Sequence, residues 1–175
     1  SVISVRDKKG QIKHYSLTDN EHHHGILKRS IAPAVNIPIT LQQQAYCYME
    51  MLLNELDYVG VMAMECFVAG QQLIINELAP RVHNSGHWTQ LGSITCQFEN
   101  HIRALAGLSL GSTEQIAITG MVNLIGTQKP PFESISDNAK LVWYNKAVKV
   151  KRKLGHINII GTDQNSIYQQ MAKFD

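Results

Sequence analysis

Alternation of apolar and polar positions marks the beginning of the chain. Two short runs at residues 1–7 and 11–17 flank the turn Lys8-Lys9-Gly10, where glycine tolerates a positive φ, so we expect a β-hairpin. The polar, histidine-rich stretch from Asp19 to Gly25 lacks this alternation. We predict a loop there, followed by a short strand.

The apolar positions of the next segment repeat with a helical period. Thr40 precedes Gln43 by three residues, which is the form of a capping box. The apolar residues that follow at helical spacing are Leu41, Ala45, Met49, Leu52 and Leu56. This pattern predicts a helix over about residues 41–56.

The pattern changes several times after residue 80. Residues 80–88 are polar and predict a loop, and a helix with one buried face is predicted from about Ser85 to Gly107. The apolar residues of that face are Leu91, Ile94, Phe98, Ile102 and Leu105. Further strand-like runs lie at 116–125, 140–144 and 154–160, and a last helical segment lies at 164–173.

Two strand-like runs at residues 60–68 and 72–79 predict an antiparallel hairpin that carries acidic residues. Period-two alternation places Glu65 on a face with apolar neighbours. Depending on whether the turn contains two or three residues, Glu65 lies opposite Asn76 or opposite Glu77. Either register brings oxygen ligands together.

Acidic side chains that face one another in a hairpin need a nearby positive charge. Like charges on paired strands are destabilising, and burial of an uncompensated carboxylate costs several kcal/mol. Mg²⁺ prefers carboxylate and amide oxygens and bridges to phosphates, so the pattern predicts an ATP site with Mg²⁺. The alternative is that one acid faces solvent while the other pairs with Arg81 or Lys28.

The loop after the second acid concentrates polar side chains at a predicted helix start. Its members are Arg81, His83, Asn84, Ser85 and His87. Free N–H groups and the positive end of a helix dipole would suit a phosphate or carboxylate. The alternative is structural: Asn84 or Ser85 caps the helix, and Arg81 and His83 stay at the surface.

Composition and charge limit the possible functions. The chain has 175 residues, 44% hydrophobic and 17% charged, which is typical of a soluble globular protein. Its 16 Lys and Arg against 14 Asp and Glu give no general attraction to nucleic acid or to anionic membranes. The longest apolar run is about half of the roughly 20 residues that a membrane helix needs. Three separated cysteines favour a reducing cytoplasm over a disulfide framework.

Two stretches resemble the 5-(carboxyamino)imidazole ribonucleotide synthase family, the ATPase subunit of phosphoribosylaminoimidazole carboxylase, in the ATP-grasp superfamily. The first runs from Tyr58 to Phe67 and contains Glu65, and the second runs from Ile75 to Gln90. Supporting segments are Asn20-Glu21-His22, Met121–Gly126, Trp143–Lys146 and Arg152–Asn158. Together these segments extend the resemblance over nearly all of the chain.

The resemblance implies an α+β fold. Residues 1–110 would form the C-terminal part of an ATP-grasp domain, an antiparallel sheet flanked by helices, and residues 111–175 a small β-rich subdomain. It also implies that ATP phosphorylates bicarbonate to carboxyphosphate, and that 5-aminoimidazole ribonucleotide becomes N5-carboxyaminoimidazole ribonucleotide in purine biosynthesis. A cytoplasmic homodimer acting on small molecules is expected, without nucleic acid or membrane partners.

The resemblance also assigns roles to individual residues. Glu65 and Glu77 resemble the Mg²⁺ ligands, and Arg81 and Glu77 the catalytic residues. The residues expected to contact ATP are His22, Asn76 and Glu77. Those expected on the bicarbonate and ribonucleotide side are Arg81, His83, Asn84 and Ser85. The cations expected to hold the ribonucleotide phosphate are Lys146, Arg152 and Lys153.

This sequence departs from the family in two ways. Val82 stands where many relatives have proline, which changes the stiffness of the loop but no ligand. The family's N-terminal domain, its phosphate-binding lysines and its adenine hinge are not in this sequence. We therefore expect the chain to be part of a longer enzyme and to be inactive by itself.

The same residues also allow other functions. A formate-dependent glycinamide ribonucleotide transformylase or a biotin carboxylase would share paired acids, but Asn84-Ser85-Gly86-His87 favours the first family. A non-catalytic nucleotide-binding or dimerisation module has no use for clustered charge that is costly to bury. Zinc binding by His22-His23-His24 is disfavoured because consecutive loop residues rarely converge on one ion.

Overall fold

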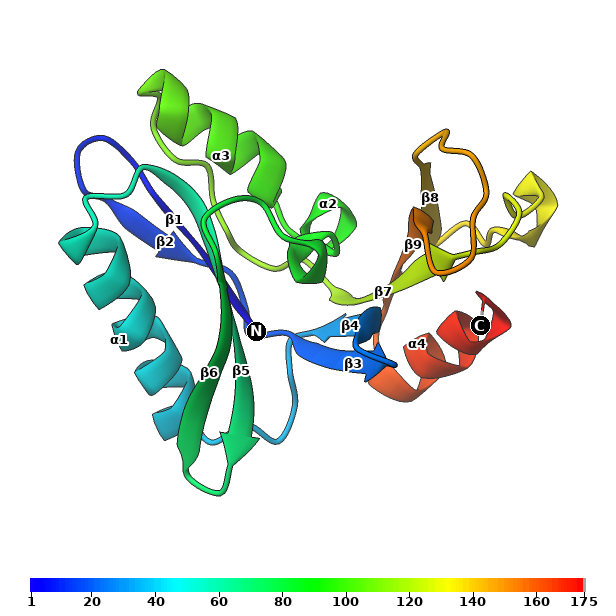
Figure 1. The fold of residues 1–175 in the computed structure, drawn as a ribbon, viewed down its shortest axis with the longest axis horizontal. Coiled ribbons are helices and arrows are strands. Elements are labelled where there is room, and N and C mark those ends of the chain that lie inside the picture. Colours follow the sequence, from blue (N-terminus) through cyan, green and yellow to red (C-terminus); the bar gives the residue numbers. More distant parts are fainter. Residues whose placement is uncertain (175) are drawn as a thin grey trace.

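Two antiparallel sheets form the framework of the protein in the computed structural model, which describes residues 1–174 (Figure 1). The first sheet has the order β2-β1-β5-β6, with β1 Val2–Arg6, β2 Ile12–His14, β5 Gly60–Ala69 and β6 Gln72–Ala79. The second has the order β3-β4-β7-β9-β8, with β3 Asp19–His23, β4 Ile26–Ala32, β7 Ile118–Ile125, β8 Ala139–Trp143 and β9 Lys153–Gly161. The α+β class expected from the sequence is confirmed.

Helices cover both faces of the first sheet. They are α1 Ile39–Glu55 on one face and α3 Gln97–Ala106 on the other. The short helix α2 Thr89–Gly92 contacts β7 and β9, and α4 Gln164–Met171 packs on the second sheet. Alternate residues of β5 enter different cores: Met62 and Met64 pack with α1, whereas Val61 and Ala63 pack with Trp88 and α3. The period-two alternation that the sequence shows in β5 is therefore real, and Glu65 continues the face of Val61 and Ala63.

The second sheet joins early and late parts of the chain. Strand β4 pairs with β7, with Ser30 opposite Met121, and α4 covers an apolar core of β7 and β9 residues. The sheet thus includes residues 19–32 as well as the C-terminal strands. The domain boundary expected between residues 110 and 111 stays a prediction. Within residues 1–174 no helix is long and apolar enough to cross a membrane.

The structure corrects two expectations near the start of the chain. The segment predicted as a loop from Asp19 to Gly25 contains strand β3, which pairs with β4. Its side chains are mostly exposed because β3 is an edge strand, and backbone pairing needs no apolar residues. Helix α1 occupies the predicted region, but Thr40 lies inside it and Pro38 is the N-cap, without a side-chain cap. The capping box was a wrong prediction.

The helix predicted from Ser85 to Gly107 is also corrected. The chain instead forms a 3₁₀ turn at Asn84–Gly86, the short helix α2 and then α3. The ending is confirmed, because Gly107 adopts a left-handed conformation with φ of 73°. The apolar positions expected on the buried face are largely exposed, Ile102 being 62% accessible, while Gln97 and Asn100 are buried. The polar loop therefore does not lead into the N-terminus of a long helix.

Candidate functional site

The two acids of the β5–β6 hairpin face one another. The turn is tight, since Ala69 pairs with Gln72, and this register alone would place Glu65 opposite Asn76. A β-bulge between Glu65 and Cys66 shifts the pairing by one residue, so Glu65 lies opposite Glu77. Of the two arrangements that the sequence left open, the paired acids are therefore the one formed.

Glu65 has the surroundings of a cation ligand. It is only 8% exposed, and its Oε1 has no hydrogen-bond partner among residues 1–174. The nearest basic atoms are His83 Nδ1, 3.6 Å from Oε1, and His22 Nε2, 3.8 Å from Oε2. A buried carboxylate oxygen without a partner is costly, and a metal ion would satisfy it. Glu77 is half exposed, with Oε1 4.0 Å from His83 Nε2.

The residue types fit magnesium. Mg²⁺ commonly binds proteins through one or two carboxylates together with substrate phosphates, and two facing acids supply that donor set. Among residues 1–174 no group of three or more His, Cys, Asp or Glu side chains is arranged to hold a metal ion. His23 and His24 contact each other edge to face, with ring centroids 4.2 Å apart, rather than joining Glu65.

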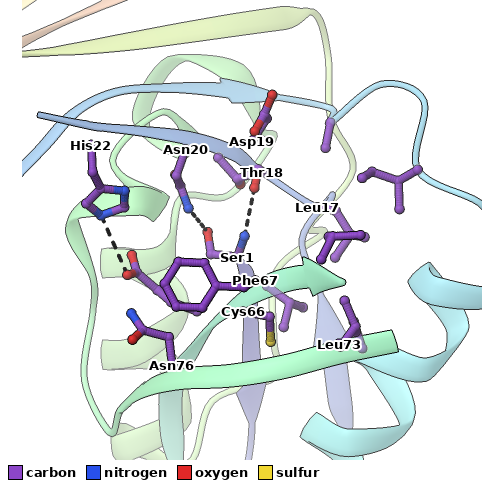
Figure 2. Close-up of a pocket in the computed structure, with 16 residues that line it drawn as sticks. Ser1, Leu17, Thr18, Asp19, Asn20, His22, Cys66, Phe67, Leu73 and Asn76 are labelled. Atoms are coloured by element: carbon purple, nitrogen blue, oxygen red, sulfur yellow. Dashed lines mark hydrogen bonds and ion pairs between the residues drawn. The ribbon is translucent and has the colours of Figure 1, made fainter. Parts of the chain in front are cut away.

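A cavity of about 300 Å³ lies beside Glu65 (Figure 2). His22 and Asn76 line it, together with apolar residues such as Phe67 and Leu73. Ser1 and Thr18 also line it. The three side chains expected in one nucleotide and metal site, those of His22, Glu65 and Asn76, are thus brought together.

A second, basic cavity of about 460 Å³ shares His22 and Glu65 with the first. The other charged or titratable residues that line it are Glu77, His83, Lys146, Lys151, Arg152 and Lys153. All three cations expected to hold a phosphate therefore lie next to the paired acids. Lys151 was not singled out from the sequence, and its place at the turn before β9 puts it in the same cavity.

His83 connects the acids to the loop that follows β6. Its Nδ1 accepts from the backbone N–H of Ser85 at 3.4 Å and lies 2.9 Å from the Ser85 hydroxyl oxygen. In the neutral ring the proton is therefore assigned to Nε2, the atom that faces Glu77. Burial lowers the pKa of His83, and the negative charge of Glu65 opposes this shift.

Because its side chain accepts from the backbone N–H of Ser85, His83 is the N-cap of the 3₁₀ turn. The sequence had offered this capping role to Asn84 or Ser85.

Lys153 extends from β9 toward the acids. Its Nζ donates to Asn84 Oδ1 at 2.6 Å. Burial lowers the pKa of Lys153, and the carboxylates of Glu65 and Glu77 act in the opposite direction. Lys153 lines the same cavity as both acids, although the residues belong to different sheets.

The remaining predicted residues have clear positions, and their roles stay predictions. Lys146 Nζ lies 5.1 Å from the centre of the Tyr144 ring, and Arg152 donates to the Ala147 carbonyl oxygen. Arg81 is exposed and donates to the Val82 carbonyl oxygen at 3.0 Å. Its positive charge lowers the pKa of both His83 and Lys153. The Ser85 side chain is buried against His83.

Sequence reasoning missed a buried glutamine that holds the loop. Gln97 Oε1 accepts from the backbone N–H of His83 at 3.0 Å, and its Nε2 donates to the His83 carbonyl oxygen at 2.7 Å. The same Nε2 lies 3.1 Å from His87 Nδ1. Gly86 is required here, because a Cβ would lie 2.6 Å from Gln97 Oε1. The sequence predicted burial of the apolar face of this helix, so the polar face that carries Gln97 was expected at the surface.

A buried histidine pair lies behind the loop. His156 Nε2 is 2.8 Å from Gln90 Oε1 and its Nδ1 is 2.7 Å from the Tyr144 hydroxyl, so Nε2–H donates and Nδ1 accepts. Burial lowers the pKa of His156 to about 4. Burial and the neighbouring His156 lower the pKa of His87 to about 3. Both rings are thus neutral in the folded protein near neutral pH.

We predict that His156→Gln makes stability less dependent on pH in the acid range. A histidine whose pKa falls on folding binds more protons in the unfolded chain, where its pKa is about 6.5. Its stabilising contribution is therefore present above pH 6.5 and is lost as the pH falls toward 4, by up to about 1.4 kcal/mol per pH unit. Urea unfolding between pH 4.5 and 6.5 should show a shallower slope for the variant. Equal slopes would contradict a neutral His156.

Comparisons with known proteins show the family to which the chain is similar. Residues 1–98 match the ATP-grasp domain family, and residues 119–170 match the phosphoribosylaminoimidazole carboxylase C-terminal domain. The chain is 45% identical over 174 residues to the N5-carboxyaminoimidazole ribonucleotide synthase of Haemophilus influenzae, covering 99% of this chain and 48% of that protein.

Solved structures give the same result. The N5-carboxyaminoimidazole ribonucleotide synthetase of Thermus thermophilus matches with a TM-score of 0.93 and 46% identity, covering 98% of this chain and 48% of that one. The Aspergillus clavatus synthase in complex with ADP and 5-aminoimidazole ribonucleotide matches with a TM-score of 0.88 and 29% identity, covering 99% and 49%. The chain spans about half the length of the curated relatives it matches.

Proposed function

This chain belongs to the ATP-grasp family, and from that premise we propose that the protein carrying it makes N5-carboxyaminoimidazole ribonucleotide from 5-aminoimidazole ribonucleotide, ATP and bicarbonate. The observation that carries this proposal is the pairing of Glu65 with Glu77 beside a cavity lined by Lys146, Arg152 and Lys153. Paired acids suit a magnesium–phosphate group, and clustered cations suit a second phosphate. The similarity of nearly the whole chain to synthases of this kind supports the same function.

The proposed reaction has two stages. The terminal phosphoryl group of ATP moves to a bicarbonate oxygen, the bond to ADP breaks, and carboxyphosphate forms. Carboxyphosphate then releases phosphate and CO₂, and the exocyclic amine of the ribonucleotide forms a bond to the carbon of CO₂ and loses a proton. The chemistry takes place in purine biosynthesis, and no redox step is needed.

The proposed roles of the individual side chains follow from their positions. Glu65 and Glu77 would hold Mg²⁺, which when bound neutralises charge on the transferring phosphoryl group. His22 and Asn76 line the nucleotide side, and Arg81 and Glu77 are the proposed catalytic residues. Because burial keeps His83 neutral near pH 7, its Nε2–H can donate to an anionic oxygen without adding a full positive charge. The ribonucleotide phosphate would be bound by Lys146, Arg152 and Lys153. Asn84 and Ser85 lie on the bicarbonate and ribonucleotide side of the proposed site.

The test is an assay of ADP release by the complete protein carrying this sequence. We expect release that depends on both bicarbonate and 5-aminoimidazole ribonucleotide. Release that depends on glycinamide ribonucleotide and formate, or on biotin, would point to another ATP-grasp ligase. If no ADP is released under any of these conditions, the proposal is wrong and a non-catalytic module is favoured.

We predict that Arg152→Ala mainly weakens ribonucleotide binding. A hydrogen bond to a charged group contributes about 1.5–3 kcal/mol, so the KM for the ribonucleotide should rise about tenfold or more, with kcat changed much less. Steady-state kinetics with Lys149→Ala as control provide the measurement, since Lys149 is exposed and does not line the basic cavity. An unaltered KM would move the phosphate site elsewhere.

The proposal also includes assembly and location. A homodimer in the cytoplasm is proposed by analogy with the family, and the three separated cysteines agree with a reducing compartment. Sedimentation of the complete protein tests the dimer.

A further inference from the structure

A buried amide pair lies at the junction of the two sheets. Asn123 lies in β7 and is completely buried, and Asn84 lies in the 3₁₀ turn that follows β6. The two amides bond reciprocally: Asn123 Nδ2 donates to Asn84 Oδ1 at 2.8 Å, and Asn84 Nδ2 donates to Asn123 Oδ1 at 3.0 Å. Neither the sequence pattern nor the proposed function had assigned a role to Asn123.

A third bond fixes the orientation of both amides. Asn123 Nδ2 also donates to the carbonyl oxygen of Leu27 at 2.9 Å. A carbonyl oxygen can only accept, so the nitrogen of Asn123 must face Leu27 and both of its hydrogens are used. The oxygen of Asn84 is therefore held toward Asn123 Nδ2, and the opposite amide assignment would leave buried atoms unpaired.

The fixed oxygen of Asn84 receives the lysine of the basic cavity. Lys153 Nζ donates to Asn84 Oδ1 at 2.6 Å, a short bond to a charged donor. A lysine side chain has a flexible four-carbon stem, so without such a partner its ammonium group samples many positions. Here the position is set by a chain of contacts from Leu27 through Asn123 and Asn84.

We propose that Asn123 is a positioning residue, which orients Asn84 so that Lys153 is aimed at an anionic group of the ribonucleotide. This inference rests on the proposed function and deepens it. A leucine at this place would fill a similar volume without the cost of a buried amide, so packing alone does not account for the asparagine. The amide network ends at a cation in the cavity that also contains Glu65 and Glu77.

The first test is Asn123→Leu in the complete protein. We expect the KM for the ribonucleotide to rise about tenfold while the KM for ATP changes less than about twofold. The matched control is Asn100→Leu, because Asn100 is equally buried and its amide bonds to Tyr15 and Gly111, with no contact to the basic cavity. The control should lower stability and leave both KM values unchanged.

A double-mutant cycle separates positioning from a general structural role. If Asn123 acts through Lys153, then Asn123→Leu should raise the ribonucleotide KM little further in a Lys153→Met background. Equal rises in both backgrounds, or equal rises for ATP and ribonucleotide, would overturn the proposal. Asn123→Ala replaces Asn123→Leu in the cycle if the leucine variant does not fold.

A second test needs neither catalysis nor a variant. Titration of the unaltered protein with inorganic phosphate should shift the side-chain amide NMR signals of Asn84 and Asn123, and should leave those of Asn100 in place. Unmoved signals at saturating phosphate would overturn the positioning role. The absence of ribonucleotide-dependent ADP release would instead refute the proposed function, so the two failures are distinguishable.

Discussion

Replacing Glu65 with glutamine in the complete protein is expected to reduce the rate of ADP release at least about a hundredfold. Glutamine keeps the volume and one oxygen acceptor but removes the charge from a buried ligand, and loss of one electrostatic contact to a reacting group commonly costs 10²–10³ in kcat. The effect should be larger at Glu65 than at the half-exposed Glu77, where water can partly replace the lost oxygen. Steady-state rates at saturating Mg²⁺ provide the measurement.

The control for this prediction is Glu50→Gln. Glu50 lies on α1, exposed, with His14 Nε2 3.1 Å from its Oε1, and it lines neither cavity of the candidate site. The Glu50→Gln variant should release ADP at the rate of the unaltered protein. The Glu65 variant should also stay folded, because Oε1 of Glu65 has no hydrogen bond to lose. An unchanged rate for Glu65→Gln would remove Glu65 from the metal ligands.

Trp88→Ala is expected to have the largest effect on stability, about 3–5 kcal/mol in the free energy of unfolding. Trp88 is completely buried in the core between the first sheet and α3, and its ring meets that of Tyr15 edge to face at 6.4 Å. Its Nε1–H donates to the Thr18 hydroxyl at 2.9 Å. The substitution therefore removes a large apolar volume and also leaves a buried hydroxyl without its donor.

Urea unfolding monitored by circular dichroism tests the effect at Trp88. Phe132→Ala serves as the comparison, because Phe132 is 85% exposed and should change the free energy of unfolding by less than about 0.5 kcal/mol. Similar losses in the free energy of unfolding for the two variants would contradict the expectation that burial of Trp88 makes a large contribution to stability.

Alternation predicted the hairpin well but not its register. The two faces of β5 follow directly from period two, and Met62 and Met64 pack against α1 on the face opposite Glu65. The register depends on the bulge that places Glu65 opposite Glu77, and no local residue signals that bulge. The polar strand β3 was missed for a related reason, since an edge strand is held by backbone bonds that any side chains permit.

Helical periodicity misled the interpretation of α3. Ile102 belongs to the regular apolar stripe yet is mostly exposed, while Gln97 and Asn100 face the interior. Periodicity identifies a stripe but does not say which side of a helix the fold covers. Gln97 can be buried because His83 and His87 use its amide fully, a match that only the three-dimensional structure reveals.

The candidate site was predicted best where charge and motif coincided. Glu65, Glu77 and Lys153 stood out as charged residues within recognisable segments, and the structure brings them to one cavity. Asn123 gave no such signal, because a neutral amide adds no charge to its segment. Its hint was a polar amide within the otherwise mostly apolar run 116–125.

The central claim is that Glu65 and Glu77 together hold magnesium at the phosphates of ATP. A crystal structure of the complete protein with Mg²⁺ and a non-hydrolysable ATP analogue tests it most directly. We predict that a carboxylate oxygen from each acid is a ligand of metal bound to the phosphates. Metal bound at the phosphates with neither carboxylate in its coordination shell would contradict the account.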